Sequence, residues 1–441
     1  MRPSETASVA EELRPVLEHL LGSPVPLALR AWDGSSIGPP DAPVTVELHS
    51  PTALTHLLWA PGELGLARAH VSGALDIDGD VFALLGVRDA IAAPDEHVSV
   101  SFGPAGWAEL ARVARRLGVV GRRPPLPPEE VKPPGRLHSR RRDAAAISHH
   151  YDVGNEFYEL LLGPSMTYSC AYWYDADDLD LAGAQAAKHE LVCRKLGLES
   201  GMRLLDVGCG WGSMAIHAAR HHGARVVGIT ISEEQAAGAR ERVAAAGLAD
   251  RVEIRVQDYR DTDDGPFDAI SSIGMFEHVG EQQMAAYLRC LRQLVRPGGR
   301  VLNHAISRPD PDDDAGVSPR SFMGRYVFPD AALLEVGTVV SSMQRTGLEV
   351  RDVHSLREHY ARTLRAWVAN LEGDWDRAQR LVGPGRARVW RLYLAGCALG
   401  FEQGRTSIHQ VLAVRPTARG ESGMPADRSS LVVDRGHPVG R

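Results

Sequence analysis

The second half of the chain alternates short apolar runs with longer stretches in which apolar residues recur every three to four positions. Strands that alternate with helices in this way are typical of an open α/β sheet of mainly parallel strands with helices on both faces. We therefore expect a Rossmann-like, seven-stranded α/β domain over residues 146–416. The predicted strands are Arg203 to Val207, Arg225 to Ile229, Val252 to Val256, Phe267 to Ser272, Arg300 to Ile306, Leu348 to Val353 and Ile408 to Val414.

The regions outside this domain show other patterns. Val9 to Leu21 has helical periodicity, Val44 to Leu48 alternates apolar and polar residues, and Gly/Pro/Asp turns such as Trp32 to Ser35 separate short elements. We expect residues 1–110 to form a smaller α+β domain, for which the family resemblance given below implies an accessory role in lipid binding or dimerisation. Residues 417–441 are rich in Gly, Pro, Ser and Arg, so we expect a disordered tail.

Residues 111–145 connect the two domains and are rich in proline and basic side chains. Ten basic residues and six prolines lie between Arg112 and Arg142, together with two acidic residues, Glu129 and Glu130. This composition is consistent with a solvated, extended tether. It is also consistent with attraction to anionic lipid head groups, which contributes about 1 kcal/mol per basic residue near a membrane surface. Both interpretations remain open.

Composition narrows the class of protein. The chain of 441 residues contains no uninterrupted apolar run near the ~18 residues that a membrane span requires. Its first part is acidic and lacks the basic and apolar order of a secretory signal, so we expect a cytoplasmic protein. The formal net charge of -7 disfavours nucleic-acid binding, which needs a positive face. The five cysteines form no Cys-x-x-Cys pair, so we expect neither a disulfide framework nor a metal site.

The most informative local motif follows the first predicted strand. Asp206 lies in that strand, glycines follow at every second position (Gly208, Gly210 and Gly212), and a helix-like stretch starts at Ser213. Alternating glycines let the backbone approach a ligand without intervening Cβ atoms, and the helix start directs its amides at that ligand. We expect a nucleotide-like cofactor here; the alternative is a glycine turn that binds nothing.

Two cofactor classes share such a turn. A dinucleotide site has the spacing G-x-G-x-x-G and an acidic residue at the end of the second strand, which binds the ribose. Here the spacing is G-x-G-x-G, and the second strand ends in Thr230-Ile231-Ser232 without an acid. The third strand runs into Asp258, which could bind an adenine amine. The pattern therefore favours S-adenosylmethionine (SAM) over NAD.

Ligands of open α/β sheets lie beyond the carboxyl ends of the strands, so the residues there are candidates for chemistry. Taken singly, each has an ordinary structural explanation: Glu277 could cap a helix, and His304 could be a core histidine. Their convergence at one edge of the sheet favours a functional site. The further candidates are Thr230 to Gln235, Asp258 and Tyr259, Gly274 to His278, Ala305 and Ile306, the aromatic segment Tyr168 to Tyr174, and Glu358 to Tyr360.

Several ordered motifs carry a family resemblance. Residues 148–415 resemble the cyclopropane fatty acyl phospholipid synthase and mycolic acid methyltransferase family, and Leu57 to Asp80 is similar to the accessory domain of bacterial cyclopropane synthases. The resemblance implies the fold of class I SAM-dependent methyltransferases. The motifs are His150 to Phe157, Met166 to Tyr172, the DVGCGWG turn at 206–212, Gly228 to Gln235, Ser272 to Gly280 and His359 to Leu364.

The resemblance implies two ligand sites. For SAM, Tyr168 and Ser169 would contact the methionine part, Gly208 and Gly210 the carboxypropyl end, and Thr230 and Gln235 the ribose. The other implied cofactor residues are Asp206, Gly212, Ile231, Asp258, Tyr259 and Ile273. A bicarbonate ion would be held by the backbones of Cys170 and Ile306 and by the side chains of Glu277, His304 and Tyr360.

The implied reaction is methyl transfer to the cis double bond of an oleoyl phospholipid. Alkene attack on the sulfonium methyl leaves a carbocation, which aromatic faces stabilise and from which water must be excluded. Bicarbonate would then remove one proton. The segment Leu27 to Ser35 resembles the actinobacterial branch that makes the 10-methylene precursor of tuberculostearic acid, so we expect that product. The alternatives are a cyclopropane product and, from another class, a methyltransferase for a soluble small molecule.

The resemblance also implies partners. We expect peripheral association with the inner face of the cell membrane, where the phospholipid substrate lies, and a homodimer. A flavin- or NADPH-dependent reductase would act on the product. These expectations rest on the resemblance alone.

Overall fold

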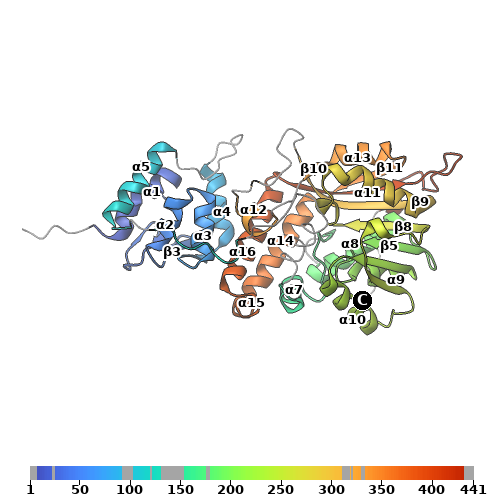
Figure 1. Cartoon of the computed structure of the whole chain (residues 1–441), viewed down its shortest axis with the longest axis horizontal. Helices are drawn as coiled ribbons and strands as arrows, with labels where there is room; N and C mark the ends of the chain where they lie inside the picture. Colours follow the sequence, from blue (N-terminus) through green and yellow to red (C-terminus); the bar gives the residue numbers. More distant parts are fainter. Residues whose placement is uncertain are drawn as a thin grey trace, which may run out of the picture. The chain divides into compact units, whose positions relative to one another are not determined.

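The computed structural model describes residues 7–21, 25–91, 103–119, 122–130, 153–174, 179–309, 318, 321–328 and 333–431 (Figure 1). The chain forms two compact units. The first comprises Met1–Lys132, Ser318–Pro329 and Asp374–Leu399, and the second Pro133–Val317, Asp330–Gly373 and Gly400–Arg441.

The first unit is an α+β fold built on a four-stranded sheet of order β2-β1-β3-β4. The predicted helix and strand near its start are α1 (Val9–Leu21) and β3 (Val44–Leu48). Its other elements are β1 (Ala28–Arg30), β2 (Ser36–Ile37), α2 (Thr52–Trp59), α3 (Glu63–Val71), β4 (Leu75–Gly79), α4 (Val81–Ile91), α5 (Pro104–Arg116), α12 (Phe322–Tyr326), α15 (Trp375–Val382) and most of α16 (Pro384–Glu402).

The boundaries of this unit differ from the predicted ones. Helix α5 continues across residue 110, and its Arg116 pairs with Glu12 of α1 at 3.1 Å. Within the predicted linker, Glu130 accepts two hydrogen bonds from the buried Arg68, at 2.7 and 2.8 Å. The described linker residues up to 130 therefore belong to the packed unit, because their charges find partners that lie far away in sequence. Residues 131–145 lie outside the described part of the chain.

Two later segments also join the first unit. Phe322 and Tyr326 of α12 and Val389 of α16 pack in one apolar cluster with Ala67 and Val71 of α3. These segments fall inside the region predicted as a single α/β domain. Local periodicity cannot show which of two cores a helix will contact.

The second unit contains the large sheet, of order β11-β12-β9-β8-β5-β6-β7. All seven predicted strands are present, and the two-residue β10 (Leu334–Glu335) adds a short eighth. The seven are β5 (Arg203–Val207), β6 (Arg225–Thr230), β7 (Val252–Val256), β8 (Phe267–Ile273), β9 (Val295–Arg308), β11 (Glu349–Ser355) and β12 (Ser407–Val414). The sheet is not wholly parallel, since β12 runs antiparallel to both of its neighbours.

Helices cover both faces of this sheet (Figure 1). Consecutive residues of β5 point to opposite faces of the sheet: Leu204 packs with one cluster and Leu205 with another. The Leu204 cluster includes α8 (Leu181–Leu196), α9 (Ser213–His222) and α10 (Glu233–Ala245), and the Leu205 cluster includes α11 (Glu281–Leu294) and α13 (Val336–Arg345). The remaining elements are α7 (Asn155–Leu162), η1 (Tyr259–Asp261), η2 (Phe276–His278), α14 (Arg357–Gly373) and η3 (Ser429–Leu431).

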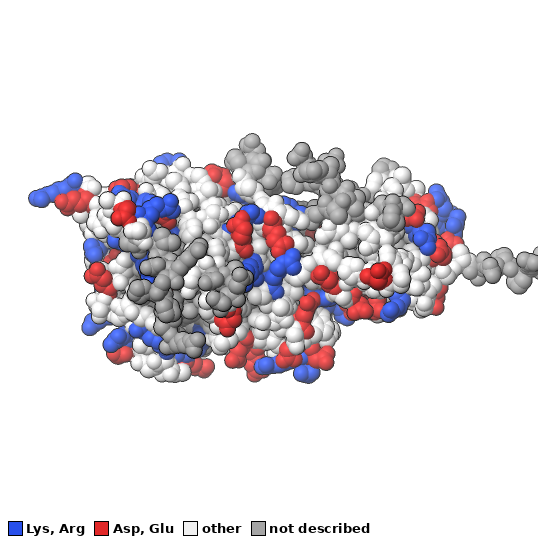
Figure 2. Space-filling view, turned by 180° about the vertical axis from the view of Figure 1, so that it is seen from behind, with Lys and Arg blue, Asp and Glu red and all other residues white. Residues whose placement is uncertain are grey.

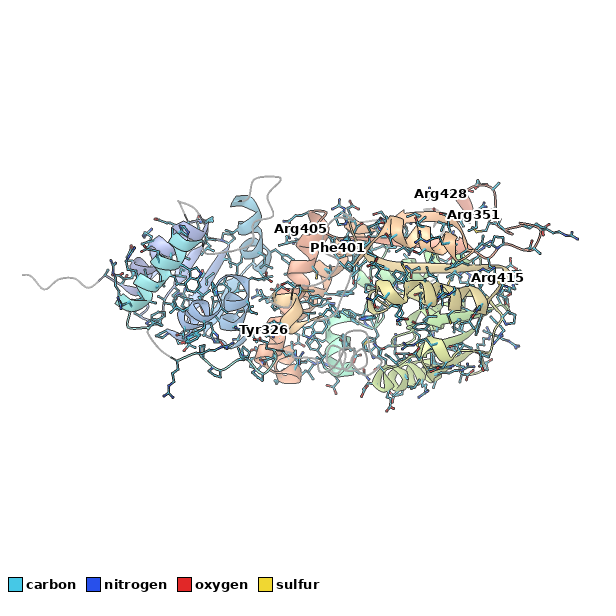
Figure 3. The ribbon with its side chains drawn as sticks, turned by 45° about the horizontal axis from the view of Figure 1, so that its top comes forward. Tyr326, Arg351, Phe401, Arg405, Arg415 and Arg428 are labelled. Atoms are coloured by element: carbon cyan, nitrogen blue, oxygen red, sulfur yellow. The ribbon has the colours of Figure 1, made fainter. Side chains whose placement is uncertain are left out.

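The first part of the segment expected to be a disordered tail, residues 417–431, packs against the rest of the second unit. Arg428, which is labelled in Figure 3, forms an ion pair with the buried Asp352 of β11, and Leu431 packs in the core beside α8. Residues 417–431 thus contact the second unit through side chains that a composition rich in Gly, Pro and Ser does not single out. Residues 432–441 lie outside the described part.

The described surface carries charges of both signs. Figure 2 shows basic and acidic side chains interspersed over the described part of one face. Of the predicted basic linker, Arg112 pairs with Glu109 and Arg116 with Glu12. Among the helices that the structure describes, none combines the length and the apolar character needed to cross a bilayer.

Candidate functional site

The glycine turn adopts backbone conformations that favour glycine. Gly208, Gly210 and Gly212 have φ angles of 75, 54 and 77°. The amides of Gly208 and Cys209 both donate to the carbonyl of Ile229, at 2.9 and 3.0 Å, which fixes the turn against the end of β6. A Cβ built on Gly210 meets no protein atom within 4 Å, so this glycine faces open space.

A cavity lies at the carboxyl ends of β5, β6, β7 and β8. Eleven of the twelve predicted cofactor residues line it; Gly212 instead forms the N-cap position of α9. The eleven are Tyr168, Ser169, Asp206, Gly208, Gly210, Thr230, Ile231, Gln235, Asp258, Tyr259 and Ile273. The cavity therefore brings together segments that are up to about a hundred residues apart in the chain.

Two polar pairs shape one side of the cavity. The Thr230 hydroxyl donates to the Gln235 side-chain oxygen at 2.9 Å and accepts from the Ser232 amide at 3.2 Å. Asp258 accepts hydrogen bonds from the backbone amide and the guanidinium of Arg260, at 2.9 and 2.8 Å. Both side chains are thus held in place by protein contacts at the positions predicted for ribose and adenine binding.

A buried lysine, which the sequence analysis missed, forms the other side. Lys188 of α8 donates to the Ser169 hydroxyl at 3.0 Å and lines the cavity with Asp206. Burial lowers the pKa of Lys188 to about 7 and raises the pKa of Asp206 to about 6, although the Ser271 hydroxyl donates to Asp206 at 2.6 Å. The low dielectric around the pair outweighs the attraction between the charged forms.

A signal for this residue was present in the sequence. The chain has only three lysines among its 49 basic residues, and two of the three, Lys188 and Lys195, are almost fully buried. Lys195 pairs with Asp352 at 2.9 Å. Because arginine cannot replace the compact ammonium group in such sites, a lysine in an arginine-biased chain marks a position with a specific demand.

The five residues predicted to hold bicarbonate, all of them described, lie outside the lining of this cavity. Glu277 lies in η2, immediately after β8, and its Oε1 accepts a hydrogen bond from the Ile306 amide at 2.8 Å. Its Oε2 is buried and has no hydrogen-bond partner among the residues that the structure describes. Burial raises the pKa of Glu277 to about 7. Near neutral pH this carboxyl can therefore either donate or accept a hydrogen bond.

His304, on β9, is 1% exposed. Its Nδ1 lies 3.0 Å from the Gln410 side-chain nitrogen, and its buried Nε2 has no hydrogen-bond partner within the described part of the chain. Since the Gln410 amide donates to Nδ1, the ring proton lies on Nε2 in this arrangement. Burial, together with the positive charges of Lys188 and Lys195, holds the pKa of His304 well below its ordinary value, so the ring is neutral.

Backbone contacts bring the other three residues into this neighbourhood. The Cys170 thiol contacts the Leu356 carbonyl at 3.7 Å, and the Tyr360 amide donates to the same carbonyl at 3.0 Å. The Leu356 amide donates to Ile408, which pairs with Ile306 across β12 and β9. A continuous set of contacts thus joins Cys170, Tyr360, Ile306 and Glu277.

A series of aromatic rings leads from the glycine turn toward this cluster. Trp211 contacts Tyr158, which contacts Tyr168, with ring centroids 4.6 and 5.6 Å apart. Tyr168 contacts Trp367 of α14 at 5.2 Å, and Trp367 contacts Tyr360 at 6.0 Å. Tyr360 also packs against Phe401, labelled in Figure 3, at 4.7 Å. Helix α14 therefore carries aromatic surface from one cluster to the other.

The strand order and the glycine turn at the end of β5 define a class I SAM-dependent methyltransferase. The protein belongs to the mycolic acid cyclopropane synthetase family, whose profile matches residues 138–411. It is therefore an enzyme that uses SAM, in agreement with the cofactor class predicted from the missing second-strand acid.

The chain is similar over most of its length to two proteins of Mycobacterium tuberculosis. It is 44% identical to a probable fatty acid methyltransferase over 91% of this chain and 93% of that protein. It is 33% identical to tuberculostearic acid methyltransferase UfaA1 over 93% of this chain and 92% of that protein. It is also 37% identical to the cyclopropane-fatty-acyl-phospholipid synthase of Escherichia coli, over 64% of this chain and 71% of that protein.

Solved structures show the same relationship. The mycolic acid cyclopropane synthase CmaA1, crystallised with SAH and CTAB, is 34% identical and has a TM-score of 0.57 over 61% of this chain and 97% of that chain. The cyclopropane synthase MmaA2 from Mycobacterium tuberculosis is 30% identical, with a TM-score of 0.56 over 61% of this chain and 98% of that chain.

Proposed function

We propose that the protein transfers the methyl group of SAM to the cis double bond of an oleoyl phospholipid and forms a 10-methylene acyl chain. The family and the names of the relatives support a fatty acyl substrate. The similarity to UfaA1 extends through both units, whereas the similarity to the Escherichia coli cyclopropane synthase covers 64% of the chain. This difference favours the methylene product over the ring.

One observation carries the catalytic part of the proposal. Glu277 Oε2 and His304 Nε2 are buried polar atoms without hydrogen-bond partners among the described residues. A buried polar group without a partner costs about 1–3 kcal/mol, so two such groups at one edge of the sheet mark a place where a ligand would lower the free energy by completing them. Both atoms belong to residues that follow or form the adjacent strands β8 and β9, at the same sheet edge as the cofactor cavity.

These two groups fit a small oxyanion that carries one proton. The His304 Nε2–H group is a donor, and Glu277, with its pKa near 7, either donates or accepts. Bicarbonate offers both acceptor oxygens and a hydroxyl, and when bound it supplies a base for one proton. Within this chain, Gln410 orients His304, and the Ile306 amide orients Glu277.

The aromatic series has a second task in this reaction. Attack of the alkene on the sulfonium methyl forms a new C–C bond, breaks the C–S bond and leaves a positive charge on the acyl chain. Aromatic faces stabilise a desolvated cation by about 2 kcal/mol or more. Tyr168, Trp367 and Tyr360 present such faces between the cofactor cavity and the Glu277 cluster. Their packing also excludes water, which would capture the cation as an alcohol.

Loss of a proton completes either product. For the methylene product, a hydride shift along the chain precedes loss of a proton from the transferred methyl group. For the cyclopropane product, the alternative, the methyl proton is lost directly as the ring closes. Both products carry one added CH₂ group, and no contact of the described residues separates the two routes.

The experiment is incubation of the purified protein with SAM and vesicles of dioleoyl phospholipid, followed by mass spectrometry and proton NMR of the released fatty acids. Distearoyl vesicles are the matched control, because they lack the double bond. A gain of one CH₂ with vinylidene proton signals supports the proposal. Upfield ring protons would identify a cyclopropane synthase, and no gain on either lipid would favour a soluble small-molecule acceptor.

The substrate class leads us to propose peripheral association with the inner face of the cell membrane, in the cytoplasm. A homodimer and a flavin- or NADPH-dependent reductase for the product stay part of this proposal. If the basic residues of 112–142 bind anionic lipid, vesicle co-sedimentation should weaken steeply as salt rises, because screening shortens electrostatic attraction. Binding that salt does not change would instead support a tether.

A further inference from the structure

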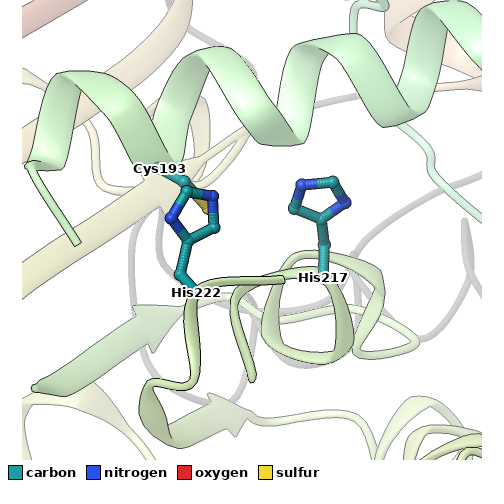
Figure 4. Close-up of side chains that lie close together, drawn as sticks. All are labelled: Cys193, His217 and His222. Carbon is teal, nitrogen blue, oxygen red and sulfur yellow. The ribbon is translucent and has the colours of Figure 1, made fainter. Parts of the chain in front are cut away.

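A second cluster of polar side chains lies between α8 and α9, away from the proposed reaction. Glu190 and Cys193 are three positions apart on α8, and His217 and His222 lie on α9. Figure 4 shows His217 and His222 projecting from α9 toward Cys193 on α8. Neither the cofactor cavity nor the proposed reaction involves these four side chains.

The donor atoms of this cluster converge. One ring nitrogen each of His217 and His222 and the Cys193 sulfur lie within 4.8 Å of one another. Glu190 Oε2 lies 3.4 Å from His217 Nε2 and 2.9 Å from His222 Nε2. Donors around a tetrahedral zinc ion are separated by roughly 3.3–3.8 Å, so side-chain movements of about 1 Å would bring the Cys193, His217 and His222 donors to these separations. Glu190 lies outside that group of three, so its carboxylate would have to turn toward the ion as well.

The surroundings suit a cation with these ligands. Arg194 occupies the other oxygen of Glu190, at 2.7 Å, which leaves Oε2 to face the two histidines. The Cys193 side chain is buried, whereas the side chains of His222 and Glu190 are 17% and 13% exposed, which gives a path from solvent.

We propose that Glu190, Cys193, His217 and His222 bind one divalent zinc ion. Two imidazoles, a thiolate and a carboxylate match the ligand preference of Zn²⁺, and the two negative ligands balance its charge. The sequence analysis expected no metal site because it searched for paired cysteines. Here the ligands come from two helices, so their spacing resembles no local zinc motif.

The ion would fasten two helices that position the cofactor cavity. Helix α8 carries Lys188, one and a half turns before Cys193, and α9 begins at the glycine turn. The role inferred is structural, because none of the four ligands lines the cavity. The site can therefore be tested by binding and stability, independently of any methyl transfer.

The test uses the full-length protein without an affinity tag, with Co²⁺ as a spectroscopic probe and Zn²⁺ for stoichiometry. We expect one Zn²⁺ per chain after equilibrium dialysis, a rise in the midpoint of thermal unfolding, and a near-ultraviolet thiolate-to-cobalt band. Cys193→Ser should abolish that band, and His222→Gln should weaken Zn²⁺ binding at least tenfold. Cys290→Ser, at a half-buried cysteine on α11, is the matched control and should change neither.

Three results would overturn the proposal. The first is that the wild type takes up no more Zn²⁺ than a His222→Gln variant does. The second is a cobalt spectrum of the wild type without the thiolate band, and the third is an equal Zn²⁺ affinity of the wild type and all variants. If Cys193→Ser does not fold, His222→Gln decides the matter, because its partly exposed ring can be replaced without opening the core. A protein without methyltransferase activity that still binds one Zn²⁺ would leave the site established and the proposed function in question.

Discussion

The cofactor cavity and the Glu277–His304 cluster lie at one edge of the same sheet but satisfy their polar groups differently. In the cavity, Thr230 bonds to Gln235 and Asp258 to Arg260, so these side chains are positioned before any ligand arrives. In the cluster, Glu277 Oε2 and His304 Nε2 are buried and have no hydrogen-bond partner among the described side chains and backbone groups. The cavity presents polar side chains whose positions are already fixed by hydrogen bonds. The cluster instead contains buried polar atoms to which a ligand or a reacting group would supply the hydrogen-bond partners.

This difference separates binding from turnover. In the proposed function, the cavity groups contact the cofactor in the ground state, so substitutions there should change the affinity for SAM. The proposed function has the cluster groups act on charge that develops during the reaction, so substitutions there should change the rate. The predictions below test that separation, from the largest expected effect to the smallest.

Glu277→Gln should lower kcat by about 10²–10³-fold, since loss of one preorganised polar group at a reacting centre has effects of that size. The affinity for SAM, measured by isothermal titration calorimetry, should stay within about twofold. Glu281→Gln, at an exposed acid that starts α11, is the matched control and should change neither. Full activity of Glu277→Gln would remove the proposed role of this carboxyl.

The pH dependence of stability should report on the same carboxyl. Burial raises the pKa of Glu277 from 4.5 to about 7. Between these values the folded state binds more protons than the unfolded chain, so the free energy of unfolding falls as pH rises, by up to about 3 kcal/mol. Glu277→Gln removes this effect. In bicarbonate-free buffer, urea unfolding should therefore show the variant gaining stability relative to the wild type from pH 5 to pH 8. A constant difference would mean that the carboxyl is not desolvated.

Gly210→Ala should weaken SAM binding about tenfold, equivalent to about 1.4 kcal/mol. The added methyl group would enter open space that we assign to the ligand. The backbone φ of 54° at this position also adds a modest strain to an alanine. Gly212→Ala is the comparison: its Cβ would lie 3.3 Å from the Ala239 Cβ, so stability should fall while the affinity of the folded protein changes less. Equal effects on affinity would show that the turn does not approach the ligand at Gly210 specifically.

Gln410→Leu should lower kcat several-fold, because the lost hydrogen bond of about 1 kcal/mol no longer fixes the tautomer of His304. The KM for SAM should not change, since Gln410 does not line the cavity. A rise in KM with an unchanged kcat would contradict this positioning role. Gln403→Leu, in the turn after α16, serves as the control for the added leucine.

The central strands β5, β6 and β8 could be predicted because each is a local apolar run that is largely buried. The edge strands β7 and β11 could be predicted from shorter alternating patterns, because part of each strand is exposed. The glycine turn and the residues after β6 and β7 could be singled out by position, since the carboxyl ends of parallel strands meet at one edge. The individual cofactor roles, and the inclusion of Tyr168 and Ser169, came from the family resemblance. Three features could not be predicted, because each depends on contacts between distant segments. They are the antiparallel direction of β12, the packing of α12 and α16 in the first unit, and the structure of the chain up to Leu431.

In the candidate site, too, residues that meet only through contacts between distant segments could not be predicted. Lys188 escaped notice because it lies on a helix before the sheet, and only the rarity of lysine in this chain marks it. The ligands proposed for zinc escaped because they face one another across α8 and α9. Sequence spacing reveals residues that share one turn or one strand end, whereas residues that meet between two helices require the fold.

The most direct test of the central claim follows the hydrogens of the transferred methyl group. The protein is incubated with SAM labelled with three deuterons on the methyl group and with dioleoyl phospholipid vesicles, and the fatty acids are analysed by mass spectrometry. Transfer to the alkene followed by proton removal predicts a product that retains two deuterons. A product that retains all three would show ordinary methyl transfer without a base acting on that group, and would contradict the role proposed for Glu277 and His304.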